Sequence, residues 1–208
     1  MATSSDTTLL AIHGLRLKGF TGADTIAKLQ GLSEADTTAA LTAAAESGFV
    51  MFRDGRRTGW TMTAEGRQEN ERLLREELDA AGARDVVQAV YDAFLQLNGA
   101  MLQVCTNWQV KGENELNDHG DAAYDAGVIE DLAGLDDKVQ PLCATLAEQL
   151  DRFAIHAPRF TSSLAKVRAG ETEWFTKPIM ESYHTVWFEM HEDLLASLGI
   201  DRASEKAH

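Results

Sequence analysis

Cysteine is scarce in this chain, whose 208 residues include only Cys105 and Cys143. Both lie in apolar, helix-like patterns and neither belongs to a metal-binding spacing, so we expect buried thiols in a reducing cytosol. No apolar run approaches the ~18 residues that cross a bilayer. The first residues also lack the basic and apolar blocks of a secretory signal. We therefore predict a cytoplasmic protein with no membrane partner.

Recognisable catalytic motifs are also missing. The sequence has no Gly-rich phosphate loop, no Gly-x-Ser-x-Gly turn, and no cysteine with a histidine close by. Asp118 and His119 are adjacent and could form an oriented base, but a polar loop explains them equally well. We predict a protein that is not an enzyme and needs no cofactor.

Basic residues are fewer than acidic residues, and the excess of negative charge is unevenly distributed along the chain. The chain has 19 Lys/Arg and 33 Asp/Glu residues, a formal net charge of −14. Residues 1–72 hold 8 basic and 9 acidic residues, a balance of −1, so the remainder carries −13. Such an acidic body repels nucleic-acid phosphate at long range, yet a local basic segment still makes contact. The charge distribution is therefore compatible with DNA binding but does not indicate it.

The first third of the chain has the element order helix, helix, helix, strand, turn, strand. Apolar spacing and capping residues predict helices over 9–17, 21–31 and 33–48, with a tight turn at 31–33. Two short strands follow at 49–52 and 58–63, joined by a charged turn at 53–57. This is the order of a winged helix-turn-helix.

The segment Met62-Thr63-Ala64-Glu65-Gly66 strengthens that interpretation. With the preceding basic turn, it resembles winged-helix transcriptional regulators of the MarR and PadR kind, in which a strand ends in Leu-Thr-x-x-Gly or similar. The resemblance implies a DNA-binding domain over 7–72, whose third helix enters the major groove of double-stranded DNA and whose hairpin is the wing. The remaining two thirds resemble no family that we can name.

The residues expected to contact DNA lie on the third helix and the wing. The helix begins with acids, and no Lys or Arg occurs between Lys28 and Arg53. Threonines are therefore its nearest groups to the bases, and phosphate contact falls to the wing. The predicted contacts are Thr37, Thr38 and Thr42 on the helix, and Arg53, Arg56 and Arg57 on the wing. The alternative for the arginines is an ordinary solvated turn.

The rest of the chain is predicted to be all helical, which makes the fold mainly α. A charged helix is predicted from 68 to 78, and its second half and the break after it form a linker at 73–83. The linker joins the winged helix to a bundle over 84–200, and no strand is expected after Thr63. Pro141 should kink or restart a helix, and Pro178 should begin the last one. One row of apolar residues is spaced alternately 3 and 4 positions apart, as on one face of a helix: Val87, Val90, Phe94, Leu97, Met101, Val104 and Trp108. This stripe is expected either to form a dimer interface or to pack within one subunit.

The last predicted helix, 178–199, carries the densest set of polar and aromatic side chains. Glu181 and His184 have the Glu-x-x-His spacing of di-iron bundles, but the chain has only one such motif, so a metal site is disfavoured. A small-molecule pocket is the second hypothesis, and an ordinary aromatic core is its alternative. The pocket would be walled by Trp108, Tyr183, Trp187 and Phe188, with His119, His184 and His191 as polar contacts.

These patterns together predict a DNA-binding regulator of transcription. One recognition helix makes few base contacts and two-fold symmetry doubles them, so we expect a homodimer held by the bundle. The bundle is also the expected site of a small-molecule effector. The alternative is an adaptor that binds no DNA, in which the winged helix is a protein-binding platform and the acidic bundle docks on a basic partner.

Overall fold

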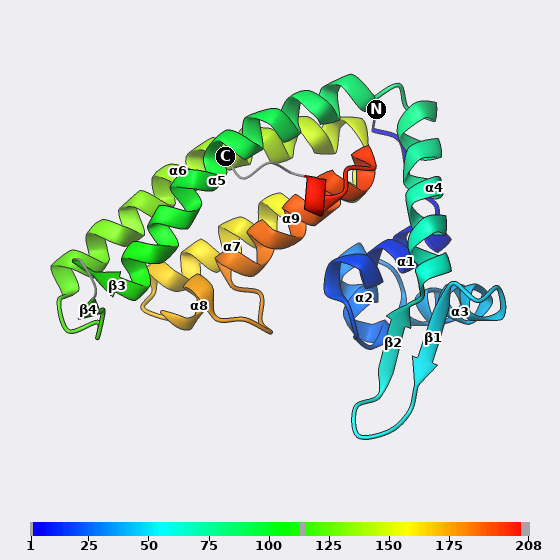
Figure 1. Cartoon of the computed structure of the whole chain (residues 1–208), viewed down its shortest axis with the longest axis horizontal. Helices are drawn as coiled ribbons and strands as arrows, with labels where there is room; N and C mark the ends of the chain where they lie inside the picture. The colour runs from blue at the N-terminus through cyan, green and yellow to red at the C-terminus, as the bar shows by residue number, and fades with distance from the viewer. Residues whose placement is uncertain (1, 113–114, 205–208) are drawn as a thin grey trace.

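The structure, a computed structural model, describes residues 2–112 and 115–204 and is mainly helical. Figure 1 shows a small N-terminal module, with a two-stranded hairpin, beside a long helical bundle. Among the described residues, no helix combines the length and the apolar character needed to cross a bilayer.

The N-terminal module contains three helices and one antiparallel hairpin. These elements are α1 (Thr7–Lys18), α2 (Ala23–Gln30), α3 (Glu34–Glu46), β1 (Val50–Arg53) and β2 (Gly59–Met62), with Val50 opposite Met62. Ser33 caps α3, and Gly31 ends α2 in the left-handed conformation, as predicted. Helix α2 begins at Ala23 rather than Thr21, because the Thr21 backbone pairs with Trp60 of β2 instead.

The Thr-x-x-Gly segment has a physical explanation at the start of α4 (Ala64–Ala80). The Thr63 hydroxyl accepts a hydrogen bond from Gly66 N at 2.9 Å, which caps the helix. A Cβ on Gly66 would lie 1.8 Å from the Phe49 carbonyl oxygen, so only glycine fits there. This helix starts before the predicted 68 and runs from the hairpin to the bundle, where Gly82 ends the connection at φ +61°.

The bundle is built on two long antiparallel helices, α5 (Arg84–Gln109) and α6 (Ala122–Gln149). Against them pack the 3₁₀ turn η1 (Asp151–Ile155), α7 (His156–Arg168), α8 (Glu173–Thr176) and α9 (Tyr183–Leu198), followed by η2 (Arg202–Ser204). The predicted α5 stripe lies inside this core: Val87 and Phe94 are fully buried, and Trp108 is nearly so. The stripe is therefore not a dimer interface, because it packs within its own subunit.

Three expectations for the bundle were wrong. A small hairpin, β3 (Val110–Lys111) and β4 (Glu115–Leu116), follows α5 where no strand was predicted. Helix α6 does not restart at Pro141 but continues through it, and Val139 before it and Cys143 after it are both buried in the core. Helix α9 begins five residues after Pro178, at Tyr183, where the Ser182 hydroxyl caps the Thr185 N–H.

The module and the bundle share an extended junction. Helices α1 and α4 both pack against α9, and α2 reaches η1. On α4, Leu74 is buried with Leu9 and Ala196, whereas Leu78 belongs to the bundle core. Helix α4 is thus a partly buried connection that packs on both parts and not only a charged spacer.

Candidate functional site

The hairpin tip, residues 53–57, projects away from the bundle in Figure 1. Arg53, Arg56 and Arg57 are all exposed, and across residues 2–112 and 115–204 their side chains form no ion pair. Arg57 lies over the Phe20 ring, with its guanidinium carbon 5.8 Å from the ring centroid. The tip therefore presents three guanidinium groups, with Asp54 as the single acid among them.

Helix α3 lies beside the hairpin and packs mainly on α1, α2 and β1, so its outer side is left uncovered by the bundle. Thr38 and Thr42 are exposed as expected, and the Thr42 hydroxyl donates to the Thr38 carbonyl at 2.8 Å. Thr37 was predicted to be exposed, and this is wrong. It is fully buried, because its hydroxyl turns inward and donates to the Ser33 carbonyl at 2.9 Å.

The exposed charges of α3 are all negative. Glu34 and Asp36 lie in its first turn, where carboxylates interact favourably with the helix dipole, and Glu46 lies in its last turn. The Ser33 hydroxyl also donates to the Asp36 carboxylate at 2.6 Å. Positive charge in the module therefore comes from outside α3, from the hairpin tip and from residues such as Lys28 of α2.

The residues of the predicted ligand pocket pack against aromatic neighbours. Tyr183 is fully buried against Phe160, and its hydroxyl donates to Asp136 at 3.0 Å. Trp187 stacks on Phe94 with 4.5 Å between ring centroids, and its Nε1 donates to Asn98 at 2.9 Å. Such filled, hydrogen-bonded surroundings make an ordinary aromatic core.

The other predicted pocket residues are scattered. Trp108 stacks on Phe175 at 4.4 Å, and His119 lies against the same indole and pairs with Asp125 at 2.9 Å. His191 is buried near Phe94, whereas His184 is exposed. Phe188 is exposed and lines two surface hollows near the junction, one with Arg16 and Glu192 and the other with Lys18 and Glu181. The other six predicted residues line neither hollow, so the set does not form the common pocket that was predicted.

The Glu181–His184 pair does not form the start of a metal site. Glu181 accepts from Lys18 at 2.5 Å and from Arg159 at 2.7 Å. Burial alone would raise the pKa of Glu181, but these two cations lower it to about 2. Among the described residues, no group of three His, Cys, Asp or Glu side chains is placed to hold a metal ion.

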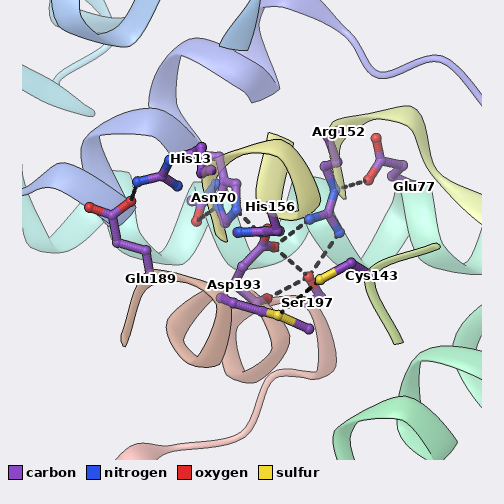
Figure 2. Close-up of polar contacts among 11 residues, drawn as sticks. His13, Asn70, Glu77, Cys143, Arg152, His156, Glu189, Asp193 and Ser197 are labelled. Carbon is purple, nitrogen blue, oxygen red and sulfur yellow. Dashed lines mark hydrogen bonds and ion pairs between the residues drawn. The ribbon is translucent and has the colours of Figure 1, made fainter. Parts of the chain in front are cut away.

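Sequence reasoning missed a buried polar cluster at the junction, centred on Asp193 of α9 (Figure 2). Asp193 is 1% exposed and meets three cationic or imidazole donors from three elements. His13 Nε2 of α1 lies 3.0 Å from Oδ1, Arg152 of η1 donates to Oδ1 at 2.5 Å, and His156 Nε2 of α7 lies 2.8 Å from Oδ2. One carboxylate thus joins the module to two parts of the bundle.

The cluster extends to both ends of the junction. Arg152 also donates to Glu77 of α4 at 2.7 Å and to Ser197 of α9 at 2.8 Å. His13 Nδ1 lies 3.4 Å from Asn70 Oδ1 of α4. We call the following residues the junction network: His13, Asn70, Glu77, Arg152, His156, Asp193 and Ser197.

Burial and charge act against each other in this network. Burial alone would raise the pKa of Asp193, but Arg152 and His13 hold it well below its ordinary value. Burial lowers the pKa of His156, and Asp193 offsets only part of that effect. Asp193 is therefore ionised and His156 neutral near neutral pH. The sequence signal was present, because Glu189, Asp193 and Ser197 recur every four residues on a helix that is more than half apolar.

Comparison of the chain with protein-family models, curated proteins and solved structures found no match. Two features of the molecule bear on function. One is the uncovered α3 with its arginine-tipped hairpin, and the other is the junction network.

Proposed function

We propose that residues 7–72 are a winged helix-turn-helix of the MarR and PadR kind, and that the protein is a DNA-binding transcriptional regulator. The observation that carries this proposal is the hairpin tip, whose three arginines are exposed without an acidic partner beside an uncovered α3. Arginines held in this way are free to pair with phosphate, which accepts guanidinium hydrogen bonds bidentately.

The acidic bundle does not prevent such contact. Its charge acts at a distance, and physiological salt screens exposed charges beyond about 8 Å. The tip carries Arg53, Arg56 and Arg57 against Asp54, a local balance of +2. The attraction between the tip arginines and phosphate at contact distance therefore remains. Long-range repulsion by the bundle lowers the affinity for DNA sites that fit the protein poorly.

Base contact in this proposal comes from Thr38 and Thr42 on α3, and Thr37 is excluded by its burial. Each exposed threonine offers a methyl group and a hydroxyl, and the Thr42 hydroxyl proton is already used within the helix. Threonine discriminates bases less strongly than the bidentate contacts of Arg, Asn or Gln. We therefore expect binding whose affinity comes mainly from the phosphate backbone.

A homodimer would pair through the outer side of α5 rather than through its buried stripe. Between residues 86 and 110 the only charged residue is Asp92, and Ala93, Ala100 and Leu102 are exposed. A chain of net charge −14 repels a second copy, so two copies approach most easily along a nearly uncharged surface. A dimer would contain two α3 helices, and two-fold symmetry doubles the number of base contacts where both reach DNA.

A salt series of DNA binding tests the proposal. Fluorescence anisotropy with a mixed-sequence duplex should give an affinity that falls steeply as salt rises, because phosphate contacts release counterions. The double substitution Arg56→Ala/Arg57→Ala should flatten the log–log slope by up to about 1.8, since each phosphate contact contributes about 0.9. Lys138→Ala/Arg168→Ala removes two exposed cations from the bundle and should leave the slope unchanged.

The acidic outer side of α3 favours one alternative, an adaptor that binds a basic protein. Glu34, Asp36 and Glu46 are exposed on a helix that has no cation. The same titration separates the two functions. No binding at low salt, or equal slopes for the wing and bundle variants, would refute the regulator and favour the adaptor.

A further inference from the structure

We propose that His13 is a proton-controlled latch between the N-terminal module and the bundle. With both ring nitrogens protonated it holds α1 against α9, and losing one proton loosens this contact. The latch is independent of whether the module binds DNA, because it concerns the junction alone.

The first observation is that both nitrogens of His13 face oxygen acceptors (Figure 2). Nε2 lies 3.0 Å from Oδ1 of the ionised Asp193, and Nδ1 lies 3.4 Å from Oδ1 of Asn70. Neither oxygen donates a hydrogen bond, so both contacts require an N–H on the ring. Only the imidazolium form supplies two.

The second observation is the state of the Asn70 amide. Its Oδ1 faces His13, and its Nδ2 is buried and has no partner among the described residues. Rotating the amide by 180° would direct Nδ2 at His13 and suit a neutral ring instead. Asn70 therefore has one orientation for each charge state of His13, which makes the pair a two-state element.

The third observation is the charge balance of the junction network. Asp193 and Glu77 supply two negative charges, and Arg152 supplies one positive charge. His156 is neutral, and its Nδ1 has no partner within residues 2–112 and 115–204. These groups are almost completely buried, so an excess charge is expensive. A protonated His13, itself 1% exposed, makes the network neutral.

The neighbouring charges leave Asp193 as the carboxylate that pairs with His13. The other buried or half-buried charges at the junction neutralise one another, with Arg16 on Glu71 and Glu192, and Lys18 and Arg159 on Glu181 and Glu189. Strand β2 has no charged residue. The remaining charged side chains of α2, α3 and α4 are exposed or paired at the surface: Asp24, Lys28, Glu34, Asp36, Glu46, Glu65, Arg67, Glu69, Arg72, Arg75, Glu76 and Asp79.

Deprotonation of His13 has a direct structural consequence. It removes the Nδ1–H donor, so the Asn70 amide has to rotate to keep a hydrogen bond to the ring, and it leaves one uncompensated negative charge in the network. Because His13 is the member of the network that α1 contributes, the loss falls on the contact between α1 and α9. The latch would thus let pH control how firmly α1–α3 and the hairpin are held relative to the bundle.

Side-chain nitrogen NMR of the full-length, ¹⁵N-histidine-labelled protein between pH 6 and 9 tests the latch, with His13 assigned by its absence in His13→Gln. We expect both ring nitrogens of His13 to carry protons while α1 is protected, and one of these protons to be lost when the contact loosens as the pH is raised. In the same pH interval, hydrogen-exchange protection factors of α1 should fall by roughly ten- to a hundredfold, the effect of an unsatisfied buried group. Those of α5 and α6 should stay constant.

Two variants sharpen the test. Asn70→Asp places a carboxylate beside Nδ1, so the transition should move to higher pH. His184→Gln changes an exposed histidine on α9 and should leave the transition unmoved. The latch is overturned if His13 is singly protonated throughout, if its deprotonation leaves α1 protection unchanged, or if Asn70→Asp fails to move the transition. The NMR measurement on the unmodified protein stands even where a variant does not fold.

Discussion

Arginines gather at two places in this molecule, the hairpin tip and the junction, and their surroundings differ completely. Arg56 and Arg57 are exposed and meet no carboxylate in the part of the chain that the structure describes. Arg152, in contrast, is 3% exposed and donates to Asp193, Glu77 and Ser197. The same side chain therefore holds the fold together at one place and is available to a partner at the other. Substitutions should affect stability at the junction and binding at the tip.

The largest effect is expected from Asp193→Asn, which keeps the shape of the side chain and removes its charge. Arg152 would then share the buried network with only one carboxylate, Glu77. Breaking a buried pair on one side costs about 3–5 kcal/mol of unfolding free energy. Urea unfolding measures the loss, with Arg168→Ala as a surface control within about 0.5 kcal/mol. A loss below about 1 kcal/mol would mean that the buried charges of the junction contribute no more to stability than charges on the surface.

Acid should weaken the junction through His156. Its pKa is lowered in the folded protein, so below about 6.5 the unfolded chain takes up a proton that the folded chain does not. Stability is then lost as pH falls, by up to about 1.4 kcal/mol per pH unit. Asp193, whose folded pKa is depressed, adds a further loss below about 3.8. Urea unfolding at pH 7, 6 and 5 measures how the free energy of unfolding changes with pH. In His156→Gln this change should be smaller, because unfolding then takes up about one proton fewer.

Two glycines offer an intermediate comparison between the regions. Gly66→Ala would drive a Cβ into the Phe49 carbonyl at 1.8 Å, so we expect the module to lose about 1–3 kcal/mol. Gly134 lies exposed in α6, and a Cβ added there would meet no atom within 4 Å, so Gly134→Ala should stabilise the bundle by about 0.5–1 kcal/mol. Thermal unfolding of both variants tests the pair. If both variants changed the unfolding temperature by the same amount in the same direction, the expected difference between Gly66 and Gly134 would be wrong.

Local signals predicted much of the module. Ser33 and Gly31 bound their helices as expected, and apolar spacing placed α1 and α3. The junction was beyond such reasoning, because His13 and Asp193 are separated by 180 positions and their contact follows from tertiary packing. The pocket hypothesis failed for a related reason, since periodicity places Tyr183 and Trp187 on one helix without showing whether Phe160 and Phe94 fill the space beside them. Thr37 shows the same limit, because its helix position alone does not decide which way it faces.

The smallest effect on stability is expected from Arg56→Ala/Arg57→Ala, the variant that should alter DNA binding most directly. Arg56 has no side-chain partner in the described parts of the chain, and Arg57 has only the distant ring of Phe20. The free energy of unfolding should therefore change by no more than about 0.5 kcal/mol. Urea unfolding measures it on the same samples used for the salt series. A loss comparable to that of Asp193→Asn would show that the tip is built into the fold, and any change in DNA binding would then have a structural cause.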